Sequence, residues 1–339
     1  MQAAEQSSVL EDVRQSAKLI FDLVSPELEL VEEEFERQAR SNIQVIAYIG
    51  DYLRRSGGKR VRPALTILSN YAVGGEGSNY GSIRMATVME FLHTATLVHD
   101  DVIDRAATRR NRPSINQEFG NQTAVLMGDW LYMSAFETSL TERSLEILDI
   151  LTAVTRKMTE GELLQLTLLG RTDISEEQYF DVIARKTAYL FSACCEIGAL
   201  LGKATPETQN MLRDYGMNLG IAFQLIDDLL DFTSTEDILG KPAGADLLEG
   251  KVSLPLIFLL QREPHLRAAV QTVISEGRYE GVTRAELLSA LERTGALQMA
   301  SDRAIEYATA AQSALAGLPD SPCAQVLASI PAYIVERDR

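Results

Sequence analysis

Residues 90–104 read EFLHTATLVHDDVID, and residues 220–232 read GIAFQLIDDLLDF. Each stretch carries the pattern D-D-x-x-D inside a run of apolar residues. On a helix, residues four positions apart lie on the same face, so the first and last aspartates of each pattern are neighbours. Asp is unfavourable in the middle of a helix, and unpaired carboxylates beside an apolar core are costly. The two stretches therefore predict helices whose carboxylates face a cation.

The residue types around both patterns favour magnesium as that cation. No Cys or His shares these helical faces at zinc-ligand spacing, although His99 adjoins Asp100. Magnesium prefers oxygen ligands and is typically held by one or two carboxylates together with substrate phosphates, so a metal-bridged diphosphate is the expected substrate. A solvated acidic face is the alternative, but two copies of the pattern in apolar contexts argue against it. The candidate metal ligands are Asp100, Asp101, Asp104, Asp227, Asp228 and Asp231.

Basic residues near both patterns could hold the phosphate oxygens. Arg109 and Arg110 follow the first pattern, where guanidinium groups can bind phosphate in a bidentate manner. The glycine-rich segment 56–63 (SGGKRVRP) adds further cations, and its backbone amides can also face an anion. The other basic candidates are Lys59, Arg60, Arg62, Lys186, Lys241 and Lys251. Each of these alone is commonly a solvated surface charge, so the prediction depends on the whole set.

The composition limits the class of partner and the compartment. The chain has 339 residues, 46% of them hydrophobic, and a formal net charge of −16. This charge argues against nucleic acid as a partner, because phosphate binding rewards a basic surface. The three cysteines have no metal-ligand spacing, which is typical of a reducing compartment. No signal peptide is evident and no apolar run reaches the roughly 18–20 residues of a membrane span, so we expect a cytoplasmic protein.

The pattern along the chain predicts an all-α fold. No proline lies between Pro113 and Pro206, and apolar residues recur there at three- and four-residue spacing. Alternating strand patterns and hairpin signals are almost absent. One domain over residues 1–339 is the simplest arrangement, and the polar loop 234–250 is a candidate lid. The expected helices run near 9–36, 42–55, 62–73, 81–105, 114–138, 143–169, 175–202 and 206–233, with shorter ones beyond.

At these residues the chain resembles the trans-polyprenyl diphosphate synthases, also called the polyprenyl synthetase family. The resemblance runs from about residue 57 to 251 and continues weakly to 333–337. The matching segments are GGKRVRP (57–63), HTATLVHDDVID (93–104), RR (109–110), GDWL (128–131), EGELLQL (160–166), KTA (186–188), FQLIDDLLD (223–231), GKPAGADL (240–247) and EGK (249–251). Asn111 replaces the glycine usual after RR, and Arg105 stands where an acidic residue is common. These departures concern the details of a loop.

The resemblance implies a helical bundle of the isoprenoid synthase type with a central active-site cavity, acting as a homodimer. It also implies about three magnesium ions per site: two on an allylic diphosphate at the first pattern, and a third at Asp227 with support from Asp228 and Asp231. The residues implied to contact the allylic diphosphate are Arg109, Lys186 and Lys251, with Lys241 nearby. Those implied to bind isopentenyl diphosphate are Lys59, Arg62, His93 and Arg110. Arg60 would help to shape the loop, and Thr187 and Gln224 would line the reacting centre.

The implied reaction is elongation of an allylic diphosphate by isopentenyl diphosphate. The allylic carbon–oxygen bond ionises, the isopentenyl double bond attacks the allylic cation, and a proton is lost to the released diphosphate. Stabilisation of the leaving group dominates, and no protein nucleophile is needed. His93 fits a role in this site because it precedes Asp100 by seven residues, two helical turns, on the same face.

The residues before the first pattern suggest a long product. In the family, a Phe or Tyr one turn below the first aspartate stops chain growth early, and here Ala95 and Thr96 are small. Leu92, Met89 or Val88, or a residue of the expected helix 114–138, would then set the limit. The chain therefore resembles the members that make quinone side chains, with products of roughly C35 to C50 by family analogy. The alternative is that Ala95 is only a packing residue.

Other functions remain open from the sequence. A short-chain farnesyl or geranylgeranyl diphosphate synthase would share the same motifs. A non-catalytic partner subunit of a heteromeric prenyl synthase is another alternative, although such subunits tend to lose one acidic pattern and this chain keeps both. A terpene cyclase or squalene-type synthase would not be expected to keep the GGKRVRP loop. A di-iron bundle would need a Glu-x-x-His pair from each of two helices, and the sequence holds only one such pair, Glu90 with His93.

Overall fold

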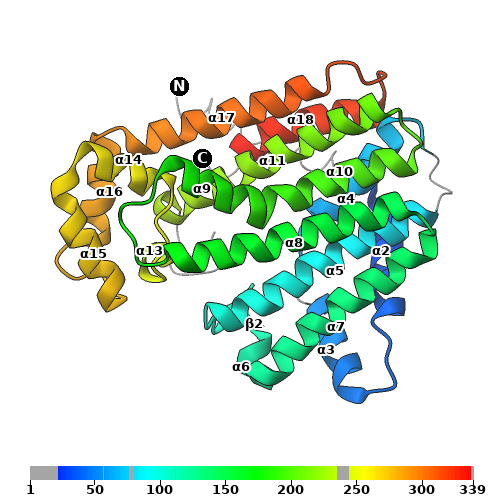
Figure 1. Cartoon of the computed structure of the whole chain (residues 1–339), viewed down its shortest axis with the longest axis horizontal. Helices are drawn as coiled ribbons and strands as arrows, with labels where there is room; N and C mark the ends of the chain where they lie inside the picture. The colour runs from blue at the N-terminus through cyan, green and yellow to red at the C-terminus, as the bar shows by residue number, and fades with distance from the viewer. Residues whose placement is uncertain (1–21, 56, 76–79, 111, 235–243, 337–339) are drawn as a thin grey trace.

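The computed structural model describes residues 22–55, 57–75, 80–110, 112–234 and 244–336, which form a bundle of helices packed side by side (Figure 1). The first part of the chain contains α2 (Ser25–Gln38), α3 (Gln44–Arg55), α4 (Val61–Ala72), α5 (Tyr80–Ile103), α6 (Ile115–Phe119), α7 (Asn121–Ser139), α8 (Leu145–Leu168), α9 (Glu176–Ile183), α10 (Tyr189–Leu201) and α11 (Pro206–Thr233). The C-terminal part adds α13 (Ala245–Leu248), α14 (Leu254–Arg262), α15 (Arg267–Glu276), α16 (Arg284–Arg293), α17 (Ala296–Ala314) and α18 (Pro322–Glu336). Within the described ranges the only strands are β1 (Thr108–Arg109) and β2 (Arg112–Pro113), an antiparallel pair after α5.

The core of the bundle lies around α5, α10 and α11. α5 packs against α7 and α4, while α11 packs against α10 and α17. α10 buries Phe191, Cys194 and Cys195, and a helix this apolar must be surrounded by other helices. One connected cluster of buried side chains extends from Val24, just before α2, to Ile334 in α18. The single domain expected over the whole chain stays a prediction.

Side-chain caps begin several helices that carry the site. Ser144 Oγ accepts a hydrogen bond from the backbone N–H of Ile147 at the start of α8, at 3.2 Å. Thr205 caps α11 in the same way, and Pro206 follows at the first helical position, where a missing N–H breaks no helical hydrogen bond. Ser175 forms a capping box at the start of α9. Local sequence therefore determines where these helices begin.

The all-α prediction is confirmed, but two expected helices are interrupted. Gly120, with φ of 84°, separates α6 from α7, so the expected helix 114–138 is two helices. This φ lies in the left-handed region, which a right-handed helix cannot include. The expected helix 175–202 is α9 and α10 joined by a π turn, η2 (Ala184–Ala188).

Two expectations fall outside the described residues. One is the beginning of the expected helix 9–36, of which residues 9–21 are not described. The other is the centre of the candidate lid, residues 235–243, which includes Lys241.

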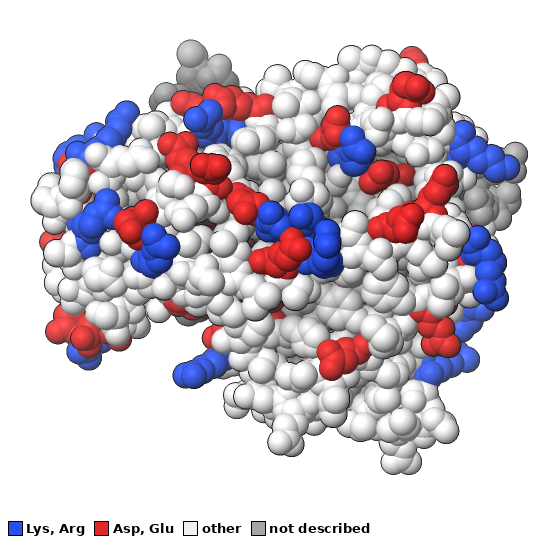
Figure 2. All heavy atoms as spheres, viewed as in Figure 1, with Lys and Arg blue, Asp and Glu red and all other residues white. Residues whose placement is uncertain are grey.

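The described surface gives two further observations. No helix within the described ranges is both long enough and apolar enough to cross a bilayer. Acidic and basic side chains are interspersed over much of the face in Figure 2, whereas the lower part, over α7, is largely uncharged. α7 exposes the apolar side chains of Val125, Leu126 and Met133 in this part of the molecule.

Candidate active site

A cavity of about 250 Å³ lies where α5, α8, α9, η2, α11 and the segment 246–253 meet. The predicted site residues that line it are Asp100, Asp104, Arg109, Lys186, Thr187, Gln224, Asp227, Asp228 and Lys251. These residues come from segments that are far apart in the sequence, and the fold brings them to one place. Their individual roles stay predictions.

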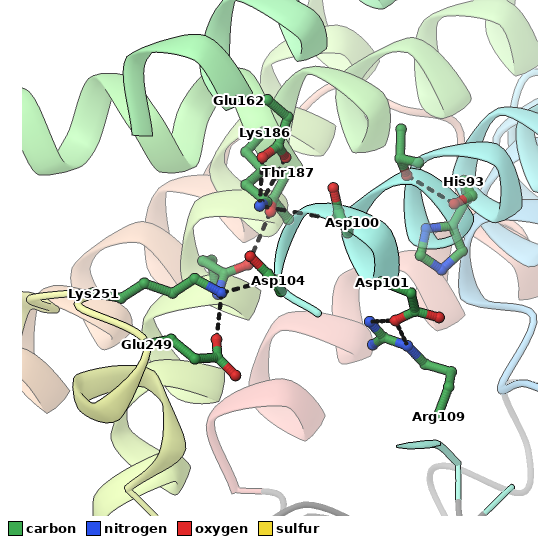
Figure 3. A network of polar contacts seen from close by, with 12 residues as sticks. His93, Asp100, Asp101, Asp104, Arg109, Glu162, Lys186, Thr187, Glu249 and Lys251 are labelled. Carbon is green, nitrogen blue, oxygen red and sulfur yellow. Dashed lines mark hydrogen bonds and ion pairs between the residues drawn. The ribbon is translucent and has the colours of Figure 1, made fainter. Parts of the chain in front are cut away.

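The first acidic pattern presents two carboxylates to this cavity, each next to a lysine (Figure 3). Lys186 Nζ lies 3.8 Å from Asp100 Oδ2, and Lys251 Nζ lies 2.9 Å from Asp104 Oδ2. Burial, together with the negative charges of Glu162 and Asp104, raises the pKa of Asp100 to about 7. A further positive charge would therefore be accommodated here, because it would favour the ionised carboxylate.

Two glutamates that the sequence analysis did not select hold these lysines. Glu162 on α8 lies 2.7 Å from Lys186 Nζ, and Glu249 lies 2.7 Å from Lys251 Nζ. The pKa of Lys251 stands above its usual value despite burial, because Asp104 and Glu249 favour the charged amine. Each lysine is thus held between one aspartate of the first acidic pattern and one glutamate from another segment. The only signal was the position of both glutamates within the EGELLQL and EGK segments.

Asp101 is oriented differently from the other two aspartates of the first pattern, and its expected part in metal binding stays a prediction. Its carboxylate is buried and accepts hydrogen bonds from Arg109, at 2.9 Å from Nε and 2.5 Å from Nη2. Figure 3 shows it pointing away from Asp100 and Asp104. The physical reason is helical geometry, since the next residue of a helix lies about 100° further around the axis. The structure therefore separates Asp101 from the pair and places it as the partner of Arg109.

The second acidic pattern is arranged differently. Asp227 is exposed to the cavity, whereas Asp228 and Asp231 are buried. Asp228 accepts a hydrogen bond from the Tyr179 hydroxyl at 2.6 Å and one from Gln224 Nε2 at 2.9 Å. The hydroxyl of Thr187 donates to Gln224 Oε1 at 2.8 Å. Burial is the main cause that raises the pKa of Asp228 to about 7.

Tyr179 is a third site residue that the sequence did not reveal. It lies on α9, one turn after the capping box of Ser175, and it lines the cavity beside Asp228. Burial and the neighbouring carboxylates raise the pKa of its hydroxyl well above the usual value, so the phenol remains a hydrogen-bond donor. No local pattern in the sequence connects Tyr179 with a carboxylate 49 residues away.

The π turn places Lys186 and Thr187 in the cavity wall. Two glycines allow neighbouring helices to approach it closely. A side chain at Gly161 of α8 would come within 2.7 Å of the Cβ atom of Arg185, and one at Gly220 of α11 would come within 2.6 Å of the Cα atom of Ala188. Single π turns inside helices are rare and frequently occur at functional sites. Helix packing at these glycines therefore supports the position of both site residues.

A group of cations lies beside this cavity, around the start of α4. The guanidinium of Arg62 lies over the ring of Phe191, at 4.8 Å from its centroid, and its Nε atom is buried without a hydrogen-bond partner. Within the described ranges, no carboxylate forms an ion pair with Arg62, and burial lowers its pKa. Burial and the nearby Arg62 and Arg110 hold the pKa of His93 well below its usual value. Buried cations without a counter-charge are costly, so this group fits an anionic ligand.

The other predicted residues of the glycine-rich loop are placed differently. Lys59 is exposed, while Arg60 forms ion pairs with Glu32 and Glu90. A smaller hollow of about 40 Å³ is lined by Gly57, Arg60, Arg109 and Arg110 and shares Leu97 and Arg109 with the main cavity. The cation group and the carboxylate cavity are thus adjacent.

The residues proposed to limit product length fall into two groups. Thr96 lines a hollow of about 490 Å³ between α5, α7 and α8, together with Tyr132 and Met158. Ala95, Leu92 and Met89 are fully buried in the core. This hollow also includes Asp100 in its wall, so it adjoins the carboxylate cavity. The part of these residues in limiting the product stays a prediction.

Comparisons with known proteins identify the family. The family model described as "Polyprenyl synthetase" matches residues 43–290. Octaprenyl diphosphate synthase of Escherichia coli (strain K12) is 39% identical over 321 residues, covering 94% of this chain and 98% of that protein. A crystal structure of a decaprenyl diphosphate synthase from Rhodobacter capsulatus matches with a TM-score of 0.89 and 34% identity, covering 95% of this chain and 99% of that one. The polyprenyl synthase structure from Caulobacter crescentus CB15, complexed with calcium and isoprenyl diphosphate, matches with a TM-score of 0.90 and 33% identity, covering 95% and 98%. The chain therefore belongs to the polyprenyl synthetase family, as a trans-polyprenyl synthase that resembles the long-chain members.

Proposed function

We propose that this protein condenses isopentenyl diphosphate with an allylic diphosphate and repeats the step to make a long polyprenyl diphosphate. The observation that supports this most strongly is the pair of adjacent sites with opposite charge. One holds the carboxylates of Asp100, Asp104 and Asp227 among lysines, which suits a metal-bridged diphosphate. The other holds Arg62 and Arg110, for which no ion pair forms within the described ranges, and this suits a diphosphate bound directly by cations. Two diphosphates bound in these two ways are the reactants of a condensation.

The residues fit magnesium as the metal, with about three ions per site by family analogy. Asp100, Asp104 and Asp227 offer only oxygen donors to one cavity, and burial already disfavours the charge on Asp100. Within the described ranges, no three acidic, cysteine or histidine side chains are close enough to hold a metal by themselves. Phosphate oxygens and water would complete the coordination, as is usual for magnesium. When bound, the metal supplies positive charge that stabilises the departing diphosphate.

In this mechanism the allylic carbon–oxygen bond breaks with both electrons leaving on the diphosphate. Lys186, Lys251 and Arg109 stabilise that charge from fixed positions, so little reorganisation is needed. The isopentenyl double bond forms the new carbon–carbon bond while Arg62 and Arg110 hold its diphosphate. A proton is then lost to the released diphosphate. Thr187 and Gln224, already hydrogen-bonded to each other, fix the wall next to the reacting carbons.

The length of the product follows from the hollow between α5, α7 and α8. Its lining is mainly apolar away from Asp100 and includes Tyr132, Met158 and Leu163. We place the growing prenyl chain there, starting next to Thr96 instead of a large aromatic side chain. A product of roughly C35 to C50 is consistent with this by family analogy, and use in quinone side chains stays a prediction.

We also propose that the protein is a homodimer through α7 and α8. Both helices expose apolar side chains, namely Val125, Leu126, Met133, Leu145, Leu163 and Leu166. Exposed apolar side chains gathered on neighbouring helices are typical of an association site. Light scattering should give twice the mass of the 37.4 kDa chain, and Leu126→Glu should lower it. A monomeric wild-type protein would contradict the proposal. The cytoplasmic location expected from the sequence stays a prediction.

The direct test is to incubate purified protein with labelled isopentenyl diphosphate, farnesyl diphosphate and magnesium, with and without a chelator. Products are dephosphorylated and sized by chromatography. We expect a magnesium-dependent ladder that ends in a long prenol. If the products stop at about C15 to C20, with shorter primers as well, the condensation activity would stand and the long product would be contradicted. No incorporation with any primer, from folded protein, would favour a non-catalytic partner subunit.

A further inference from the structure

Arg60 occupies a constrained position between two predicted substrate-binding residues. Its backbone φ of 48° lies in the left-handed region, which is uncommon for a residue other than glycine, and it immediately precedes α4. No side-chain cap hydrogen bond forms at this helix start. A backbone in such a region persists only where surrounding contacts hold it. The conformation of Arg60 decides how the chain passes from Lys59 into α4 and to Arg62.

The side chain of Arg60 supplies those contacts. Its Nε and Nη2 atoms bind the two carboxylate oxygens of Glu32 on α2, the second at 3.1 Å, and its Nη1 atom binds Glu90 Oε1 on α5. A bidentate guanidinium–carboxylate pair has a defined geometry as well as a favourable energy. The Arg60 side chain is only 13% exposed and that of Glu90 only 4%. The Arg60 guanidinium thus forms ion pairs with two carboxylates, whereas that of Arg62 forms none within the described ranges.

Glu90 also acts on the neighbouring cations. It lies on α5 one turn before His93. Its negative charge favours the charged forms of both Arg62 and Arg110, opposing the effect of their burial. Glu90 therefore has two effects, one on the shape of the loop and one on the charge of the group that faces the ligand.

We propose that Glu32 and Glu90 are positioning residues for isopentenyl diphosphate, and that they act by locking Arg60 at the start of α4. This inference rests on the proposed function, since it assigns the cation group to the non-allylic diphosphate. Arg60 does not contact the diphosphate in this arrangement. It holds the turn that sets the directions of Lys59 and Arg62, while Glu90 compensates part of the positive charge. The helix α2 thereby contributes to this substrate site through Glu32, in addition to Phe35, which lines the smaller hollow.

The test compares Glu90→Gln, Arg60→Lys and Glu32→Gln with wild type. We measure KM for each substrate, kcat, the melting temperature, and binding of isopentenyl diphosphate by calorimetry in the presence of chelator. We expect KM and Kd for isopentenyl diphosphate to rise about tenfold in Glu90→Gln and Arg60→Lys, and about threefold in Glu32→Gln, because the Glu32 side chain is more exposed than that of Glu90. KM for the allylic diphosphate should change less than about twofold, because its site is built from other segments.

The matched control is Arg84→Lys. Arg84 lies on α5, as Glu90 does, and forms a partly buried ion pair with Glu142, which follows α7, at 2.6 Å. This variant should lower the melting temperature without changing either KM. If the Arg60 and Glu90 variants behave like this control, or if both KM values rise together, the inference is wrong and the proposed function stands. If wild type neither condenses the substrates nor binds isopentenyl diphosphate, the proposed function fails and the inference fails with it. Glu32→Gln keeps the test decisive if the other variants do not fold.

Discussion

The two D-D-x-x-D patterns are almost identical in sequence and differ in their surroundings. At the C-terminal end of α5, Asp100 and Asp104, which directly follows the helix, face the cavity and each lies next to a lysine, while the middle carboxylate pairs with Arg109. On α11, only Asp227 is exposed, and the middle carboxylate accepts hydrogen bonds from the neutral donors of Tyr179 and Gln224. The same helical spacing thus presents two carboxylates in one region and one in the other.

The difference shows that the neighbours decide what each aspartate does. The carboxylates of Asp100 and Asp104 are open to the cavity, so a metal can bind them while the adjacent lysines keep their glutamate partners and face the substrate phosphate. The Asp228 carboxylate accepts hydrogen bonds from a phenol and an amide and has little access to solvent, so it is less available to a metal ion. We therefore propose that Asp100, Asp104 and Asp227 bind metal and that Asp228 supports Asp227.

The largest effect should come from the carboxylates that face the cavity. Asp104→Asn and Asp227→Asn should each lower kcat by about 1,000-fold, because the charge on the leaving diphosphate is then stabilised less well. Steady-state assays at saturating magnesium measure this. Asp101→Asn is the matched variant, and it should lose less activity because its carboxylate faces Arg109. Equal losses in Asp101→Asn and Asp104→Asn would contradict the division between cavity-facing and supporting positions.

The sequence predicts which aspartates share a helical face, but not which partners they contact in the fold. The pairing of Asp100 with Asp104 is local, since helical spacing alone puts both on one face. The partners come from distant segments, as Tyr179 does for Asp228 and Glu162 does for Lys186. No periodicity encodes such tertiary contacts. Motifs and caps accordingly predicted the helices and the set of charged residues, but not the turn away from the cavity at Asp101.

The π turn shows the same limit in the backbone. The sequence between residues 175 and 202 has no proline or other break, so a continuous helix was the reasonable expectation. The extra width of the turn is accommodated by the close approach of α8 and α11 at Gly161 and Gly220. Both glycines stand inside helical patterns, where an isolated glycine often has a packing reason. That signal identifies a close contact without identifying its partner.

A second, smaller effect should come from the lysine beside the first pattern. Lys186→Met should lower kcat/KM for the allylic diphosphate by about 100-fold, since a fixed cation next to the leaving group is lost. Kd for isopentenyl diphosphate, measured by calorimetry in chelator, should stay within about twofold. Glu162→Gln should have a milder effect in the same direction, because Lys186 keeps its charge and loses only its ion pair with Glu162. A selective loss of isopentenyl diphosphate binding in Lys186→Met would reverse the assignment of the two sites.

Tyr179→Phe tests the hydrogen bond that holds Asp228 in the second acidic pattern. Removing the hydroxyl deletes the 2.6 Å hydrogen bond to Asp228 while keeping the ring in the core. We expect kcat to fall about tenfold and the magnesium concentration for half-maximal activity to rise, since Asp227 is then less well positioned. Binding of Mn²⁺ followed by electron paramagnetic resonance gives a readout that does not depend on turnover. Unchanged metal dependence together with lower kcat would instead indicate a general packing role for Tyr179.

The smallest effect concerns the pH dependence of stability in metal-free protein. Burial raises the pKa of Asp228 from 3.8 to about 7, so the folded state binds this proton more tightly than the unfolded state. The resulting stabilisation is complete below about pH 4 and is lost as pH rises through about 7. Asp228→Asn cannot ionise at this position, so its melting temperature in chelator should fall less between pH 5 and pH 8 than that of wild type. The two decreases should differ by roughly a few degrees.

Tyr179→Phe provides the internal check on that titration. The Tyr179 hydroxyl donates to the ionised form of Asp228 and so opposes the effect of burial on its pKa. Without this donor the pKa should rise further, and the melting temperature of Tyr179→Phe should fall more steeply than that of wild type as the pH increases. The decrease in melting temperature with pH should therefore be steepest in Tyr179→Phe, intermediate in wild type and shallowest in Asp228→Asn. Equal slopes in all three proteins would mean that Asp228 is already ionised in the folded state, and the contrast between the two acidic patterns would then lie in geometry alone.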